Sequence, residues 1–312
     1  MSDLLICINA VLPIFIIICL GYFCRKIGML EEKDVIRFNS IAFRVFLPVL
    51  IFYNIYQSDL SSAFRPKLIV FSAAMVLLTF FAAILFAKKH VRNAFQRSVV
   101  IQGLFRSNIA IIGIPLATAL SQGGDISCVA VLSAVIVPLV NVLSVICLEA
   151  FGTQRSSPAA IAGGVARNPL IIGSALGILF LLLGIRLPAA LEKVIKDLSG
   201  IASPLQLFLL GAFLKVSGLK NNRAVLFAVN AGKLLIIPAA AFLAGCLLGF
   251  RGIEMIALLT VFASSTAVNS FTMAQQMNGD AELAGEIVVT TSFFCSFTIF
   301  LWSFLLKRLG MI

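Results

Sequence analysis

Residues 102–117 read QGLFRSNIAIIGIPLA, and this stretch governs how the chain can fold. It places Arg106, Ser107 and Asn108 inside an apolar run long enough to cross a bilayer, and Pro115 follows. Because proline lacks a backbone donor and clashes with the preceding turn, we expect the helix to break at Pro115. A broken helix offers unpaired N–H groups to an anion. The alternative is a kinked helix that packs through small residues.

The composition around this stretch indicates a membrane protein. Of the 312 residues, 61% are hydrophobic and only 12% are charged, whereas soluble domains are roughly a quarter charged. This small number of charges cannot cover a water-facing surface. We therefore expect an all-α polytopic protein of the cell membrane, embedded in the lipid bilayer. The net charge of +11 comes from short basic clusters between apolar stretches, which is typical of loops facing anionic lipid. Nucleic acid is therefore not expected as a partner.

Ten segments are candidates for membrane spans, since a span needs about 20 mostly apolar residues. In chain order they are residues 4–24, 35–56, 68–87, 98–120, 126–148, 170–185, 198–214, 224–250, 255–277 and 287–306. The sixth and seventh are short, and a core or re-entrant segment can look alike. With the N-terminus outside, 13 Lys and Arg lie in inner loops, against eight in outer loops and the C-terminus. This bias predicts that both termini are extracytoplasmic.

The chain also looks doubled at an offset of 156 residues, which is half its length. Pro13 and Pro169 are separated by this offset, as are Pro48 and Pro204. Gly21 with Gly177, and Gly123 with Gly279, show the same spacing. Five spans per half is an odd number, so the second half must enter the membrane with the opposite orientation. We therefore expect a first five-helix repeat (1–151), a short cytoplasmic linker (152–168) and an inverted second repeat (169–312), an architecture typical of secondary transporters.

The ninth span resembles the fourth in being unusually polar. Residues 263–272 read ASSTAVNSFT, and at the same offset Asn108 maps onto Ser264 and Gly113 onto Asn269. This segment has no proline, so a break here must come from side chains that compete for backbone groups. The alternative is a continuous helix whose polar side chains bond neighbouring helices.

Two further ionisable residues lie within or near spans. Lys233 lies inside the eighth span, where a cation must face the protein interior or snorkel. It could balance a bound anion, replace a sodium ion or pair with a carboxylate. Glu286 lies near the cytoplasmic end of the tenth span and could snorkel or take part in proton coupling. The coupling ion, proton or sodium, is left open.

Residues 106–117 resemble the fourth-helix signature of the auxin efflux carrier family. Asn39 with Leu47-Pro48, Lys233 before Pro238 and the polar ninth span also match, so the resemblance covers the whole chain. It implies the fold of bile-acid sodium symporters, with spans 1, 2, 6 and 7 as scaffold and spans 3–5 and 8–10 as a moving transport domain.

The same resemblance implies that spans four and nine cross as broken helices beside the substrate. Bacterial family members are permeases for malate or malonate, or permeases without an assigned substrate. The implied substrate is a small organic anion, carried by an elevator-type movement. Asn108 matches the position that holds the substrate carboxylate. Many relatives have a proline near Ser265, where this chain has none, which leaves the form of the second break open.

The candidate residues fall into three groups. Those expected to line the substrate site are Asn108, Ser107, Gly113, Pro115, Ser264, Ser265, Asn269 and Ser270. Those expected to balance charge or couple ions are Lys233, Arg106 and Glu286, and those on the scaffold side are Asn39, Pro48 and Pro204. We expect no catalytic residue, metal or cofactor; a homodimer is left open, as are a carrier for another solute, a channel and, less favoured, a membrane-embedded enzyme.

Overall fold

The computed structural model describes residues 2–58, 64–121, 124–152, 157–215 and 218–312, and these are helical with no strand among them. The helices are α1 (Ser2–Lys26), α2 (Glu32–Ile41), η1 (Ala42–Phe46), α3 (Leu47–Tyr56), α4 (Pro66–His90), α5 (Ala94–Phe105), η2 (Ile109–Gly113), α6 (Ile114–Leu120), α7 (Ser127–Gly152), α8 (Pro158–Arg167), α9 (Pro169–Leu182), α10 (Ala189–Phe213), α11 (Gly218–Asn221), α12 (Arg223–Ala231), η3 (Gly232–Ile236), α13 (Ile237–Leu247), α14 (Ile253–Phe262), α15 (Asn269–Gln276) and α16 (Ala281–Arg308).

Seven helical stretches in the described residues are long and apolar enough to cross a membrane. They are Glu32–Tyr56, Pro66–His90, Ala94–Leu120, Ser127–Phe151, Ala189–Phe213, Arg223–Leu247 and Ala281–Arg308. The bent pair α8–α9 would be an eighth, and α14 is a shorter apolar helix. The chain is therefore a multi-pass, all-helical membrane protein, and ten spans stays a prediction.

Three π-helical turns each precede a proline by two residues. η1 ends at Phe46 before Pro48, η2 ends at Gly113 before Pro115, and η3 is followed by Pro238 in α13. Proline cannot donate to the carbonyl one turn earlier, and its ring crowds that carbonyl. A widened turn relieves the crowding without ending the helix.

The helix of the seventh span begins earlier than the sequence suggests, and the expected linker holds a helix of its own. The seventh span was expected to be short (198–214), but α10 begins at Ala189, and its first turns carry a Lys193–Asp197 ion pair of 3.4 Å. Charged residues extend this helix as an exposed end rather than stopping it. The expected linker 152–168 contains helix α8, which meets α9 at a 64° bend. Pro169 disfavours helical geometry at Asn168, whose side chain instead caps α9.

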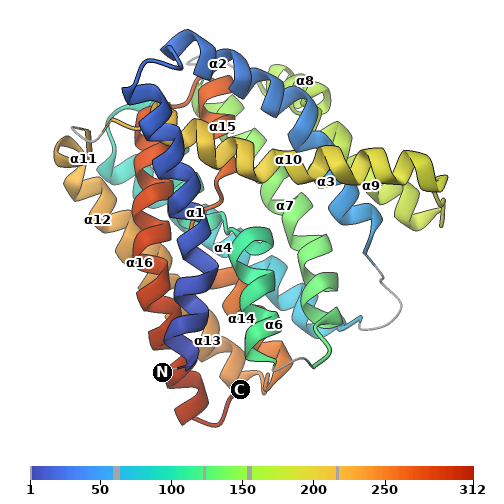
Figure 1. Cartoon of the computed structure of the whole chain (residues 1–312). Coiled ribbons are helices and arrows are strands. Elements are labelled where there is room, and N and C mark those ends of the chain that lie inside the picture. The colour runs from blue at the N-terminus through green and yellow to red at the C-terminus, as the bar shows by residue number, and fades with distance from the viewer. Residues whose placement is uncertain (1, 59–63, 122–123, 153–156, 216–217) are drawn as a thin grey trace.

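Two helix crossings hold α1 against α10 and α3 against α9 (Figure 1). A Cβ added at Gly21 would lie 1.9 Å from the carbonyl oxygen of Phe208, so only glycine fits this crossing. A Cβ added at Gly177 would lie 3.1 Å from the carbonyl oxygen of Phe52 and 2.9 Å from Ile55. Gly177 follows Gly21 by 156 residues, and Phe208 follows Phe52 by the same number. The two crossings thus use residues at the offset already seen between the prolines.

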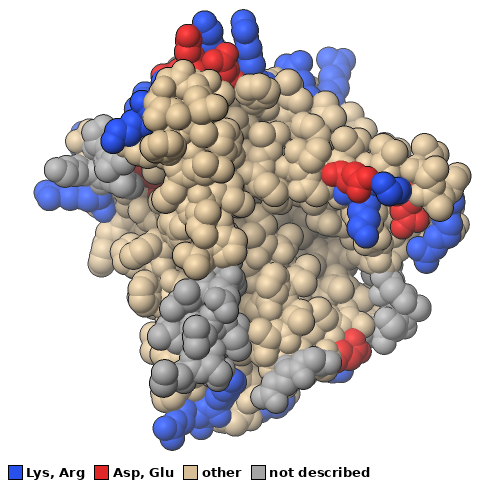
Figure 2. Space-filling model, in the orientation of Figure 1, with Lys and Arg blue, Asp and Glu red and all other residues tan. Residues whose placement is uncertain are grey.

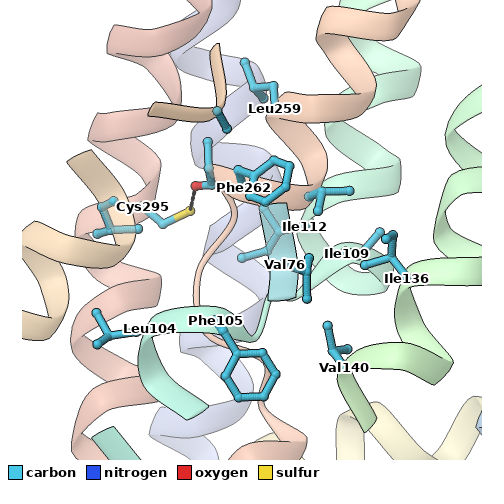
Figure 3. Close-up of a cluster of buried hydrophobic side chains, with 14 of the residues drawn as sticks. Val76, Leu104, Phe105, Ile109, Ile112, Ile136, Val140, Leu259, Phe262 and Cys295 are labelled. Atoms are coloured by element: carbon cyan, nitrogen blue, oxygen red, sulfur yellow. Dashed lines mark hydrogen bonds between the residues drawn. The ribbon is translucent and has the colours of Figure 1, made fainter. Parts of the chain in front are cut away.

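Apolar side chains converge where the interrupted helices meet (Figure 3). They come from α5, η2, α7 and α14 and are Leu104, Phe105, Ile109, Ile112, Ile136, Val140, Leu259 and Phe262. The Cys295 thiol of α16 lies at 3.5 Å from the carbonyl oxygen of Ala263, to which it donates. The crossing therefore sits in a packed core rather than at the lipid surface.

The beginning of α1 and the end of α16 lie at the same end of the molecule (Figure 1). Charged side chains gather at the top and along the lower and right-hand margins, and a broad uncharged surface separates them (Figure 2). Two termini on the same side are expected of a chain that crosses the membrane an even number of times. That this end is the outer one stays a prediction.

Candidate functional site

The fourth span is interrupted between α5 and η2 at Arg106, Ser107 and Asn108. The expected break is therefore present, but its expected place at Pro115 is wrong. Pro115 lies in the first turn of α6, where the absent N–H costs little, and the π turn η2 absorbs the crowding. The polar residues themselves end the helix, since Asn108 has φ −87° and ψ 62°.

The ninth span is interrupted too, although it has no proline. α14 ends at Phe262 and α15 begins at Asn269. In between, the Thr266 hydroxyl donates to the carbonyl oxygen of Gly103 at 2.8 Å, and the Thr266 N–H donates to Thr291 Oγ1 at 3.2 Å. Hydroxyl groups thus replace the lost helical hydrogen bonds, as the sequence argument required.

The two breaks cross in direct contact. The backbone N–H of Asn108 donates to the carbonyl oxygen of Ser265 at 2.8 Å. Gly113 allows η2 to approach α14, because an added Cβ would lie 3.0 Å from the Cβ of Thr260. The crossing is therefore fixed by main-chain contacts from both spans.

Arg106 is the main charge at the crossing, and it is buried, with 1% exposure. Its guanidinium donates to Asn269 Oδ1 at 2.7 Å and to Asn141 Oδ1 at 3.0 Å. It also donates to Gln102 Oε1 at 3.3 Å and contacts the Met273 sulfur. All these partners are neutral, and no described carboxylate forms an ion pair with Arg106. A buried cation without a counter-ion is costly.

Lys233 approaches the same break from η3. Its side chain is 1% exposed, and Nζ donates to Ser107 Oγ at 2.6 Å. The carboxylate partner that the sequence left open is absent from the ion pairs of the described residues. Two buried basic side chains therefore meet at the three-residue break, Arg106 within it and Lys233 bonded to Ser107.

A small pocket of about 70 Å³, partly open to the surface, lies beside the crossing. Its walls come from α3, the first break with η2, α7, α10 and the second break. Arg106, Ser107, Asn108 and Asn269 of the expected site line it. It adjoins a wider space of about 440 Å³ that reaches Gln57 and is also open to the surface. Figure 2 shows the hollow below the ridge formed by α10.

Several expected residues lie elsewhere. Gly113, Pro115, Ser264, Ser265 and Ser270 do not line this pocket. Ser264 and Ser265 are engaged in the second break, Pro115 is exposed, and Ser270 faces α5 and α16 instead. Side chains on one helical turn point in different directions, so polar neighbours in sequence do not share a cavity.

Glu286 and the scaffold residues also lie away from the pocket. Glu286 of α16 accepts from Asn222 Nδ2 at 2.7 Å. Asn39 of α2 accepts from Thr272 Oγ1 at 2.8 Å and donates to Gln275 Oε1 at 2.5 Å, which joins α2 to α15. The prolines expected on the scaffold side do not line the pocket either: the backbone of Pro48 packs on Gly173, and Pro204 is exposed within α10.

Four polar lining residues were not expected from the sequence: Asn54, Asn141, Ser203 and Gln206. Asn141 of α7 and Gln206 of α10 both line the pocket and are almost fully buried. Each is an amide within an otherwise largely apolar stretch, and that isolation was the available signal. In the described residues no three His, Cys, Asp or Glu side chains are placed to hold a metal ion.

Comparison of the sequence with known proteins shows the family to which the chain belongs. The family described as membrane transport protein matches residues 6–160 and 159–303. An uncharacterised transporter of Methanothermobacter thermautotrophicus is 24% identical over 300 residues, covering 96% of this chain and 98% of that protein. A putative malonate transporter of Rhizobium meliloti is 26% identical over 294 residues, covering 90% of each chain. The YfdV transporter of Escherichia coli, itself uncharacterised, is 22% identical over 296 residues.

The match extends over both halves of the sequence and includes both interrupted helices. The family and these relatives are transporters rather than enzymes. The chain therefore belongs to the membrane transport protein family, the auxin efflux carrier family that its fourth-span signature resembles.

Proposed function

We propose that this protein is a secondary active transporter of small organic anions, mono- or dicarboxylates such as malate or malonate. The observation that carries the proposal is Arg106, a buried cation that lines the pocket and has only neutral partners. A bound carboxylate would supply the missing negative charge. Charge-assisted hydrogen bonds of this kind are about twice as strong as neutral ones.

The other polar atoms of the pocket favour an anion as well. Asn141 Oδ1 accepts from Arg106, which fixes the orientation of the amide and leaves its Nδ2 as a buried donor without a protein partner. Asn108 Nδ2 and Arg106 Nε are also buried donors without partners. Buried donors rarely stay unpaired in proteins. Three such donors beside one pocket favour a ligand rich in hydrogen-bond acceptors, such as a carboxylate.

The glycine crossings support the inverted five-plus-five repeat, with repeats 1–151 and 169–312 joined by 152–168. Gly21 with Phe208, and Gly177 with Phe52, are the same contact made twice at an offset of 156. We assign α1–α3 and α8–α10 to a scaffold and α4–α7 and α12–α16 to a transport domain. The pocket then lies between the scaffold helices α3 and α10 and the breaks of the transport domain.

This division favours an elevator movement of one unit past the other. The wide space beside the pocket reaches Gln57 and Ser127, whereas on the other side Asn39 bonds Thr272 and Gln275 of α15. With both termini outside in the cell membrane, the conformation is open to the outside and closed to the cytoplasm. Lys233 at the break occupies a place where a coupling cation would act, and Glu286 remains a candidate for proton coupling. A homodimer stays open.

The alternative functions predict different behaviour. A channel needs a continuous polar path, whereas α2 and α15, away from the pocket, are joined by the bonds of Asn39 to Thr272 and Gln275. A carrier for another solute would leave the charge of Arg106 unmatched.

The test is uptake of labelled malonate and malate into proteoliposomes that contain the purified protein. We expect saturable uptake that is accelerated by the same acid inside, since counterflow separates a carrier from a channel. Arg106→Met serves as the inactive control. Uptake that does not saturate, or that Arg106→Met leaves unchanged, would refute the proposal.

A further inference from the structure

Gln206 of α10 has a feature that no other pocket residue shares. Its Nε2 donates to the carbonyl oxygen of Ala202 at 3.0 Å, which fixes the orientation of the amide. The oxygen Oε1 therefore faces away from that bond, and it is buried without a partner among the described residues. The side chain is 2% exposed and lines the pocket. An unpaired buried acceptor of this kind calls for a donor.

The remaining buried side-chain polar atoms without partners around the pocket are all donors. They belong to Arg106, Asn108 and Asn141, on the first break and α7. Gln206 stands on α10, which belongs to the other wall of the pocket. A molecule that satisfies both walls must have acceptors for one and a donor for the other.

We propose that Gln206 is a specificity residue that selects carboxylates bearing a hydroxyl group, and this rests on the proposed function. The carboxylate bonds the donors around Arg106, and the hydroxyl donates to Gln206 Oε1. An amine would also be a donor. It would carry a positive charge into a site that already holds the buried cations Arg106 and Lys233, so amino acids are disfavoured. Hydroxy acids remain as the class that fits.

The position of Gln206 also predicts which kinetic constants it affects. Gln206 and the donors lie on units that move relative to one another in the proposed mechanism, so the hydroxyl contact exists in this state and is lost on translocation. Removing a contact made only in the bound starting state weakens binding without slowing the later step. Loss of Gln206 Oε1 should therefore raise KM for hydroxy acids and raise the maximal rate by a similar factor, because the contact stabilises only the bound starting state.

The experiment compares acids that differ only by the hydroxyl: lactate against propionate, and malate against succinate. Binding is measured on purified protein by calorimetry, and uptake by proteoliposomes. We expect the parent to bind each hydroxy acid about tenfold more tightly than its partner, the size of one well-made buried hydrogen bond. Gln206→Met, similar in length but without an amide oxygen, should reduce the ratio to about one by weakening only the hydroxy acids.

The matched control is Ser199→Ala on the same helix. Ser199 is buried and bonds the Lys196 carbonyl, but it does not line the pocket, so the ratio should stay at the parent's value. A parent that binds both members of each pair equally would overturn this inference, since the acceptor is then met by water. A ratio that survives in Gln206→Met would overturn it too. If no acid of either pair binds the parent, the proposed function fails along with it.

Discussion

The two interrupted helices cross at one point but are built in opposite ways. The first break, at Arg106, Ser107 and Asn108, is followed by a π turn and a proline, and it leaves Asn108 Nδ2 and Arg106 Nε without partners. The second break has no proline. Its hydroxyls bond backbone and neighbouring side chains, including Thr266 to Gly103 and Ser292 to Ser265.

This difference separates recognition from support. Unpaired buried donors cost free energy in the empty protein, so a fold selected only for stability would satisfy them. The second break does so, while the first keeps its donors at the pocket. We infer that the first break binds the substrate and that the second holds the first in place.

The largest effect should follow from Arg106→Met. Removing the cation should weaken carboxylate binding at least about a hundredfold, because loss of a buried charge partner costs several kcal/mol. The melting temperature of the substrate-free protein should change much less than the affinity does, since the change also removes an uncompensated buried charge. Calorimetry and thermal unfolding on the same sample give both numbers.

Arg106→Lys tests whether charge alone suffices. Lysine keeps the charge but cannot bond Asn141 and Asn269 through one planar fork. We expect binding between that of Met and the parent. Binding of Arg106→Met equal to the parent's would show that the pocket is not an anion site.

Asn108→Ala should have the next largest effect. The amide can donate to a carboxylate, and a hydrogen bond to a charged acceptor contributes roughly 1.5–3 kcal/mol. Binding should therefore fall about tenfold to a hundredfold. Asn108→Asp should bind worse still, because its carboxylate competes with the substrate for Arg106. If Asn108→Ala binds like the parent while Asn269→Ala does not, the recognition residues lie on the second break instead.

Thr266→Val probes the second break and should act on stability. The change leaves the Gly103 carbonyl without its donor, a loss of about 1–2 kcal/mol in the free energy of unfolding. Substrate affinity should change little in the protein that remains folded. Thr266→Ser keeps the hydroxyl and is the matched control. A loss of affinity without a loss of stability would assign recognition to both breaks.

Much of this architecture was predictable, because it depends on the length of the apolar stretches and on the residues that interrupt helices. Uncharged stretches of the right length marked the long spans, and Arg106 and Lys233 were noticed because cations are rare in apolar segments. The exact interruption was not predictable from Pro115, since a proline in a first turn is tolerated and a π turn can absorb it.

The composition of the pocket was harder to predict than the breaks. Asn141 and Gln206 come from spans whose other polar residues are serines, and the role of each amide depends on which way it is held. Ser264 and Ser270 were expected at the site because the ninth span is unusually polar and corresponds to the fourth. Their direction from the helix axis decides otherwise, and that direction is set by tertiary packing of α14–α16 rather than by local sequence.

Pro115→Ala should have the smallest effect, and it tests whether the proline is needed for the first break. The second break forms without any proline, through side chains that replace helical hydrogen bonds. By the same logic, Arg106, Ser107 and Asn108 should hold the first break open through the Asn108–Ser265 backbone bond and the Lys233–Ser107 contact. Alanine restores one donor to the η2–α6 junction, so the π turn should tighten locally while affinity changes less than about threefold, which is under 0.7 kcal/mol. Calorimetry with the best-bound acid, run on Pro115→Ala and Asn108→Ala side by side, shows whether the proline or the polar triplet shapes the first break. A loss as large as that of Asn108→Ala would mean that the proline, and not the polar triplet, shapes the binding site.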